Sequence, residues 1–306
     1  MTAMPFTSFM PFLHVATALV LAPLLPSIIT RVKAIFAGRR GAPLLQPYYD
    51  IAKLLRKSAV YGDTTTWLFR MGPTVGLAAV LTALLLVPFG GSPAVLAFRG
   101  DIIVFAYVLA LARAATIVAA LDTGSSFEGM GASRESAFSA IVEPALILGL
   151  VAVMRKAGGG SLSTFLHPHR VETAAATTTL VIGALFVVYL AENARIPVDD
   201  PATHLELTMV HEVMVLDHSG PDLAFIHYAA ALKLWVLGAL IVGLAVPQPA
   251  ASPWAAYALA LAGIAGVAAV TGIVESTMAR LRMAAVPSLL FAGSALAGVA
   301  LILGLR

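Results

Sequence analysis

Ionisable side chains gather between Tyr189 and Ser219, in a chain that is otherwise mostly apolar. The segment holds six of the protein's 16 Asp and Glu, and these lie among one arginine and three histidines. They are Glu192, Asp199, Asp200, Glu206, Glu212 and Asp217, with Arg195, His204, His211 and His218. Carboxylates and imidazoles exchange protons, and charge beside hydrocarbon is costly, so such a cluster between two spans predicts a functional site. A solvated loop is the alternative interpretation.

The cluster does not match a metal motif. Asp200 suits a helix N-cap and Pro201 a first helical position, which predicts a helix from about 201 to 217. His211 and Glu212 lack the second histidine of a zinc-protease motif, because residue 215 is valine. The aspartates lack the second Asp-rich segment that magnesium-dependent membrane prenyltransferases need. We therefore predict no metal site and no cofactor in this chain.

Composition defines the fold class. The chain of 306 residues is 59% hydrophobic and 11% charged, whereas soluble domains carry about 25% charged residues. Apolar runs long enough to cross a bilayer predict an all-α polytopic membrane protein, a single transmembrane domain over residues 1–306. We expect about eight spans, the first of them kinked at Pro23 and Pro26, near residues 12–30, 73–90, 101–121, 137–154, 175–192, 223–246, 254–274 and 286–305.

Lysine and arginine predict the orientation in the membrane. Of the 19 such residues, 12 fall on one side of the predicted spans, five on the other, and Arg113 and Lys233 lie within spans. The richer side is expected to face the cytoplasm. The long cytoplasmic loops are then about 31–72, 122–136, 193–222 and 275–285, both termini lie outside, and the protein resides in the inner membrane. No nucleic-acid motif accompanies the basic residues.

The first cytoplasmic loop contains two features. Pro47 opens a short amphipathic helix whose apolar face suits the headgroup region of the bilayer. A surface anchor is one interpretation of it. The preceding turn, residues 38–43, carries Arg39 and Arg40 and suits a partner's acidic surface or a lipid phosphate.

In the second such loop, Ser133 is expected to be an N-cap, with Glu135 in the first helical turn. Arg134 lies between them, and Glu128 lies on a Gly-rich stretch just before.

Three ionisable residues fall inside predicted spans. Glu143 precedes a proline in the fourth span, and Arg113 in the third is one candidate partner for it. A purely structural ion pair between them is the alternative to a functional one. Lys233 lies about ten residues into its span, where a proton path and a buried ion pair are both open interpretations.

Three strings resemble a known family: residues 38–57 (GRRGAPLLQPYYDIAKLLRK), 121–144 (LDTGSSFEGMGASRESAFSAIVEP) and 191–235, which begin AENARIPVDDPATHLELTMVHE. They are similar to the membrane subunit of formate hydrogenlyase and hydrogenase-4, complexes of the group 4 nickel–iron hydrogenases. That family is related to the quinone-site membrane subunit, subunit 1, of respiratory complex I. The resemblance spans essentially the whole chain.

The resemblance implies a non-catalytic subunit that anchors a hydrophilic redox arm and links it to antiporter-like proton-pumping subunits. Nickel–iron and iron–sulfur centres are expected in the large and small partner subunits, since this chain has no cysteine to ligate them. Carried over by motif, the acidic loop comprises Glu192, Arg195, Asp199, Asp200, Glu206 and Glu212. The residues that meet the arm are Arg39, Arg40, Glu128, Arg134 and Glu135, and the intramembrane charges are Arg113, Glu143 and Lys233.

Two other functions are open at this stage. A quinone-reducing, complex I-like assembly is one, although Ile196-Pro197-Val198 departs from the complex I loop and favours the hydrogenase branch. A stand-alone transporter is the other, and it predicts an internal inverted repeat. The halves 1–154 and 155–306 share no such pattern.

Overall fold

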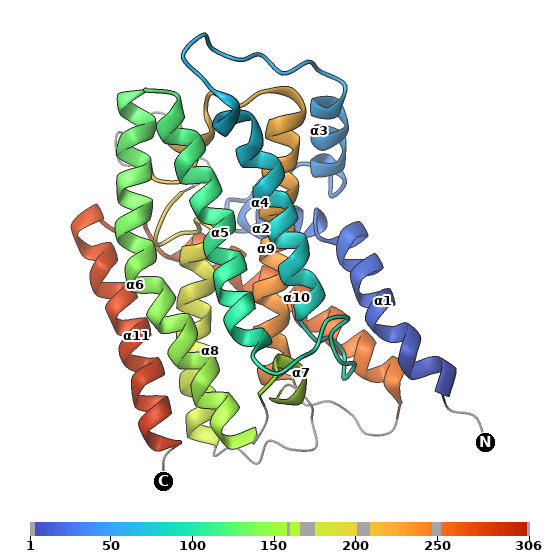
Figure 1. Ribbon diagram of the computed structural model, residues 1–306. Helices are drawn as coiled ribbons and strands as arrows, with labels where there is room; N and C mark the ends of the chain where they lie inside the picture. Colours follow the sequence, from blue (N-terminus) through green and yellow to red (C-terminus); the bar gives the residue numbers. More distant parts are fainter. Residues whose placement is uncertain (1–3, 158–159, 166–174, 201–208, 247–251, 305–306) are drawn as a thin grey trace.

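Helices dominate the computed structural model, which describes residues 4–157, 160–165, 175–200, 209–246 and 252–304 (Figure 1). Within those ranges there is no β-strand beyond a single bridge between Phe89 and Ser92. The α-helices are α1 (Met4–Leu21), α2 (Leu24–Phe36), α3 (Gln46–Leu55), α4 (Trp67–Leu86), α5 (Asp101–Asp122), α6 (Ser126–Ala157), α7 (Leu162–Phe165), α8 (Ala175–Glu192), α9 (Gly220–Ala245), α10 (Pro253–Thr277) and α11 (Val286–Leu303). Two short 3₁₀ helices are η1 (Glu212–Val215) and η2 (Met283–Ala285).

The predicted all-α membrane fold is confirmed, and each predicted span overlaps at least one helix. Six helices of the described chain are long and apolar enough to cross a bilayer, and the bent pair α1–α2 raises the number to seven. The eighth expected span corresponds to α8, whose described apolar part, residues 176–192, is shorter. The count of eight therefore stays a prediction. The chain is a multi-pass membrane protein.

Proline breaks the first span, as the sequence predicts. The axes of α1 and α2 differ by 50°. Pro26 cannot donate the backbone hydrogen bond to residue 22, and its ring crowds that carbonyl. The break lies at Ala22 and Pro23, directly before α2.

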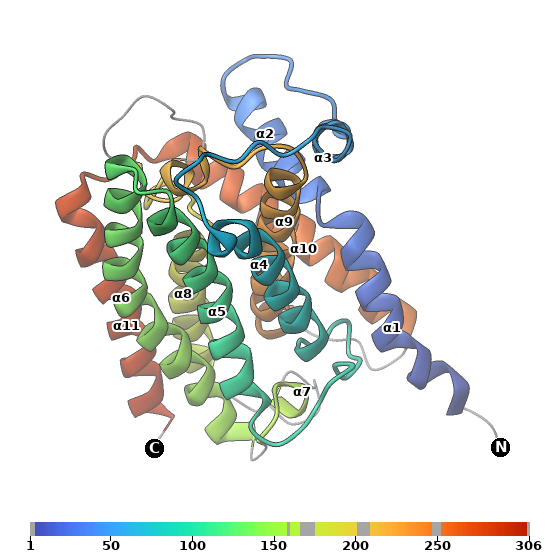
Figure 2. The ribbon, with the colours of Figure 1, turned by 45° about the horizontal axis from the view of Figure 1, so that its top comes forward.

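Helix α9 is the centre of the bundle. It packs against α4, α8 and α10, and Leu232, Trp235 and Val236 on it are fully or almost fully buried. Helix α6 packs against α5, α8 and α11, as both views of the ribbon show (Figures 1 and 2). The amphipathic helix predicted from Pro47 is confirmed as α3, which lies beside α9 at the end of the bundle opposite to the start of α1 and the end of α11 (Figure 1).

The prediction that a helix begins at Ser133 is wrong. Helix α6 begins at Ser126, so Ser133, Arg134 and Glu135 all lie inside it. Glycines at 129 and 131 suggested a loop, but Gly131 provides space rather than flexibility. A Cβ there would lie 2.3 Å from Val213 Cγ1 and 2.9 Å from the carbonyl oxygen of Val210. Glycine is present because the chain around η1 packs directly onto α6.

The α-helix expected over residues 201–217 is wrong for residues 209–217, which form a bend, turns and the 3₁₀ helix η1. The amides of Val210 and His211 donate to the Asp199 carboxylate instead of to helical carbonyls. Residues 201–208, with His204 and Glu206, lie outside the described residues.

We expect Gly131→Ala to destabilise the protein by about 1–3 kcal/mol, because the added methyl group overpacks the contact with η1. Thermal unfolding of the purified complex in mild detergent measures this. The matched control is Gly129→Ala, two residues away on the same helix, where a Cβ meets nothing within 4 Å. That substitution should leave the unfolding temperature unchanged or raise it, because alanine has the higher helix propensity. Equal effects of the two substitutions would contradict the packing role of Gly131.

Candidate functional site

The C-terminal end of α8 directs a charged segment across the bundle. Ala194 adopts a left-handed backbone with φ of 49°, and the amide of Arg195 donates to the carbonyl of Leu190 at 2.8 Å. This is the six-to-one hydrogen bond with which many helices end. The chain therefore leaves the helix axis directly after Glu192 and passes Arg195 and Asp199 toward different neighbours.

Arg113 of α5 joins two carboxylates. Its Nη1 lies 2.7 Å from Glu192 Oε1, and its Nη2 lies 2.7 Å from Glu143 Oε1 on α6. The side chains of Arg113 and Glu192 are 7% and 2% exposed, whereas that of Glu143 is 44% exposed. Lys233 Nζ of α9 lies 3.8 Å from the other oxygen of Glu192. Four helices thus contribute to one ion-paired group.

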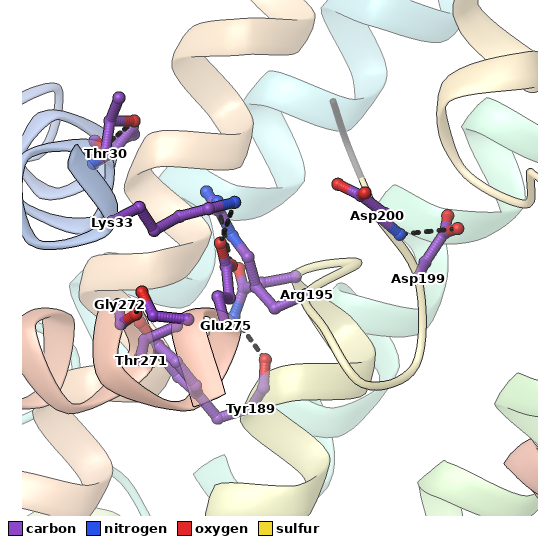
Figure 3. A network of polar contacts seen from close by, with 12 residues as sticks. Thr30, Lys33, Tyr189, Arg195, Asp199, Asp200, Thr271, Gly272 and Glu275 are labelled. Carbon is purple, nitrogen blue, oxygen red and sulfur yellow. Dashed lines mark hydrogen bonds and ion pairs between the residues drawn. The ribbon is translucent and has the colours of Figure 1, made fainter. Parts of the chain in front are cut away.

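Glu275, near the end of α10, is the second buried anion. Lys33 from α2 and Arg195 from the segment after α8 converge on it (Figure 3). The Lys33 Nζ–Glu275 Oε2 distance is 2.8 Å, and the Arg195 Nη1–Glu275 Oε1 distance is 3.5 Å. The Glu275 side chain is fully buried, so the two cations compensate a charge that hydrocarbon and protein would otherwise disfavour.

Asp199 is the third anion. It accepts from Arg280 Nη2 at 2.9 Å and from the backbone amides of Asp200, Val210 and His211 at 2.9, 3.3 and 3.0 Å. Burial raises the pKa of the Asp199 carboxyl above its ordinary value, while these donors stabilise its charged form. The carboxylate fixes both the loop before residue 201 and the chain that re-enters the bundle at residue 209.

Three hollow spaces meet around these charges. One of about 60 Å³ is lined by Arg113, Glu135, His211 and Lys233 among others. A second, of about 20 Å³, has Arg113, Glu135, Glu192 and Asp199 in its walls. A third, of about 480 Å³, lies between α2, α3 and α9 and is lined by Glu192, Arg195, His211, Glu212 and Lys233. A polar cavity holds water once it exceeds about 10–15 Å³. Water can therefore connect side chains that do not touch directly.

His211 lies in the walls of both the first and the third space. Burial and, to a smaller extent, the nearby cation Lys233 lower the pKa of its imidazole to about 3. A neutral imidazole both donates and accepts a hydrogen bond, which suits it to join water chains on its two sides.

The other predicted site residues are distributed differently. Asp200 directly follows Asp199, Glu212 lies on η1 at the wall of the largest of the three spaces, and Glu206 is outside the described residues. Arg39 and Arg40 are exposed in the turn after α2. Arg134 donates to the carbonyl of Met209 at 3.0 Å. Glu128 is only 2% exposed, so of the five residues expected at the redox arm, Arg39 and Arg40 present the most accessible charge.

The sequence predicted one of these contacts and missed others. The suggested pairing of Arg113 with Glu143 is confirmed. Glu192 was placed in the acidic loop rather than beside Arg113, and Lys33 was not singled out at all. A lysine in the last turn of one span and a glutamate at the end of another give no sequence signal that they meet.

Comparison with known proteins identifies the family. A family model described as NADH dehydrogenase matches residues 9–304. Formate hydrogenlyase subunit 4 of Escherichia coli K12 is 32% identical over 302 residues, which cover 95% of this chain and 97% of that protein. Hydrogenase-4 component C of the same organism is 30% identical and covers 92% and 91%. An NADH-quinone oxidoreductase subunit of Verminephrobacter eiseniae is 26% identical and covers 64% and 57%. The chain belongs to the NADH dehydrogenase family of membrane proteins.

A solved structure supports the fold. A chain of the membrane-bound sulfane sulfur reductase, described as an archaeal respiratory membrane complex, superposes with a TM-score of 0.82. The superposition covers 98% of this chain and 99% of that one at 19% identity. The path of the helices described above is therefore shared with a membrane protein of respiration.

We expect Arg113→Gln to destabilise the purified complex by about 3–5 kcal/mol, because it leaves the buried Glu192 charge without its arginine. Glu143→Gln is the matched control, and its effect should be smaller because solvent screens the half-exposed Glu143. The double variant Arg113→Gln/Glu192→Gln should be more stable than Arg113→Gln alone. Thermal unfolding of the wild type and these three variants measures the effects, and a double variant no more stable than Arg113→Gln alone would contradict the pairing.

Proposed function

We propose that this protein is the membrane-anchoring and proton-coupling subunit of a multisubunit nickel–iron hydrogenase of the formate hydrogenlyase or hydrogenase-4 type. It docks a hydrophilic redox arm and links it to antiporter-like membrane subunits. The subunit itself is non-catalytic, and the nickel–iron and iron–sulfur centres reside in its large and small partners. The extent of similarity to two hydrogenase membrane subunits supports this, as does the absence of any cysteine in the chain.

The observation that carries the coupling role is the Arg113–Glu192–Lys233 group and its adjoining cavities. The ion pairs of the described residues join five cations with four carboxylates. Glu135 lies with Arg113 in the walls of two cavities and is a further carboxylate of the region. A proton that arrives on or leaves Glu135 changes the charge balance of the group around Arg113. We therefore assign Glu135 to proton coupling rather than to docking of the arm.

Electron transfer in the arm can act on such a group through its electric field. A unit charge moved at ~7 Å, with an effective dielectric constant of about 20, changes the energy by about 2 kcal/mol. That energy corresponds to more than one pKa unit. Carboxylates at the arm-facing end would then take up or release protons as the redox state changes. The three ion-paired groups include residues of α5, α8, α9 and α10, so a change in charge at this end acts on all four helices.

The orientation follows from the charge distribution. We place the protein in the inner membrane with the long basic loops in the cytoplasm and both termini outside. Support comes from the 19 Lys and Arg of the sequence, 12 of which fall in the predicted inward loops. The exposed turn with Arg39 and Arg40 is then available to an acidic surface of the arm.

A coupling role predicts that proton movement can be lost while hydrogen chemistry continues. In the intact complex, Glu135→Gln and Glu212→Gln should leave assembly and dye-linked hydrogenase activity near wild type. Proton translocation by inverted membrane vesicles should fall severalfold, because a neutral amide cannot carry the proton. Asp63→Asn removes an exposed carboxylate outside the network and should change neither property. Unchanged translocation in both glutamate variants would mean that these carboxylates are merely solvated or structural.

A docking role predicts that charge reversal releases the arm. Arg39→Glu/Arg40→Glu should lower the yield of hydrophilic subunits that co-purify with a tag on this chain, and more so as salt is raised. Arg155→Glu, an exposed position at the end of α6, is the control and should retain the arm. If both proteins retain it at equal salt, the turn after α2 is not the docking surface.

A quinone-reducing assembly is the second candidate function, and the cavity of about 480 Å³ between α2, α3 and α9 favours it. That volume lies within the range of small-molecule sites, about 300–1,000 Å³. The purified complex distinguishes the two functions directly. Nickel together with hydrogen evolution establishes the hydrogenase, whereas a complex without nickel that reduces a soluble quinone analogue establishes the alternative.

A further inference from the structure

A deep groove lies between α5 and α6, at the end of the bundle away from the ion pairs. Its volume is about 1000 Å³, and Arg99 and Gly100 lie at its end, directly before α5. Helices α5 and α6 run side by side there, close to α7 (Figure 2). Neither Arg99 nor any other lining residue belongs to the ion-paired groups described above.

The walls of the groove are apolar and regularly spaced. Ile102, Ile103, Ala106 and Tyr107 form the wall from α5, and Ile147, Leu150, Val151 and Met154 form the wall from α6. These positions repeat at three- to four-residue intervals, so each helix presents one stripe, over about 8 Å on α5 and about 10 Å on α6. Tyr107 is 72% exposed, which shows that the groove opens sideways, toward the bilayer. Hydrocarbon is the chemistry that matches these walls.

Arg99 provides the opposite chemistry at the end of the same groove. Its guanidinium makes no ion pair with any residue of the described ranges. The residue is exposed, and the aliphatic part of its side chain lies directly over Gly160: a Cβ on this glycine would lie 2.8 Å from Arg99 Cγ. The amide of Gly100 donates to the carbonyl of Gly160 at 2.7 Å and fixes the two segments together. A positioned cation at a span end faces the level of lipid phosphates.

We propose that this groove is a binding site for one anionic phospholipid, with its phosphate on Arg99 and an acyl chain between α5 and α6. Charge complementarity selects this occupant over a transmembrane helix of a partner. An apolar helix would fill the walls but leave the Arg99 charge against it uncompensated, at a cost that a phosphate avoids. A lipid held here would cover the surface of α5 and α6 that the bundle leaves open.

A photoreactive side chain in the groove tests the proposal in native membranes. Tyr107 is replaced with p-benzoylphenylalanine in the complete complex, the membranes are irradiated before solubilisation, and adducts of this chain are identified by mass spectrometry. We expect anionic phospholipids to be enriched among the adducts relative to their share of the bulk membrane lipid. Arg99→Gln should reduce that enrichment by about fivefold, which corresponds to ~1 kcal/mol for one exposed charge pair.

Two further variants make the result specific. Gly160→Val keeps the charge but forces Arg99 aside, and should also reduce the enrichment. Arg155→Gln removes an exposed cation at the end of α6 that does not line the groove, and should leave the enrichment unchanged. The proposal would be overturned if the adducts had the composition of the bulk lipid and Arg99→Gln did not change it. Adducts to a second polypeptide would also overturn it, because the groove would then be a subunit interface. If the Arg99 variant fails to assemble, the protein with Arg99 intact still tests the proposal: adducts without enrichment of anionic phospholipids would contradict it.

Discussion

The structure depends on the pairing of buried charge along the eight residues that follow the body of α8. The charges in this segment alternate in sign, and each pairs with an opposite charge on another element. Glu192 pairs with Arg113 and Lys233. Arg195 pairs with Glu275, and Asp199 pairs with Arg280. An uncompensated charge at these depths costs several kcal/mol, whereas a compensated one contributes little net stability. The pairs therefore act mainly as a constraint. They fix where α8 ends relative to α5, α9 and α10, and any rearrangement must exchange partners rather than merely separate them.

Such a constraint suits the transmission of charge. In an apolar core, a shift at one place acts on its neighbours only through volume and packing, because the close-packed interior is hardly compressible. Within an ion-paired group, neutralising one member changes the preferred partner of the charge beside it, because the interior screens charge poorly. Arg113 shows the geometry most directly, since one guanidinium serves a buried carboxylate and a half-exposed one. Protonation of one carboxylate is expected to shift the arginine toward the carboxylate that is still charged. Arg113 and Glu135 line the same two cavities, so such a shift occurs next to Glu135.

Much of the fold was predictable because hydrophobicity is local. Runs of apolar residues identify spans, and Pro23 and Pro26 indicate the kink in the first span. Neither prediction needs knowledge of a residue elsewhere in the chain. The errors arose where a distant residue decides local structure. From the sequence alone Gly131 indicates a loop, and only the structure shows that it leaves room for Val213. His211 belongs to a predicted helix until its amide is found on Asp199. Pairing across helices fails for the same reason: the sequence shows which charges need partners but, apart from Arg113 and Glu143, it did not indicate which partners they take.

The two ends of the bundle manage polarity in different ways, and the difference has a physical basis. At one end, charges from many helices compensate each other inside the protein, which requires a precise relative position of α5, α8, α9 and α10. At the other end, Asp101 is satisfied locally by Ser161 and the amide of Leu162. Where ion pairs join the helices, the helices must stay close together. At the opposite end the facing sides of α5 and α6 are apolar, and there a groove lies between them. A groove that accommodates hydrocarbon is thus expected at the end without the network, and a rigid junction at the end that contains it.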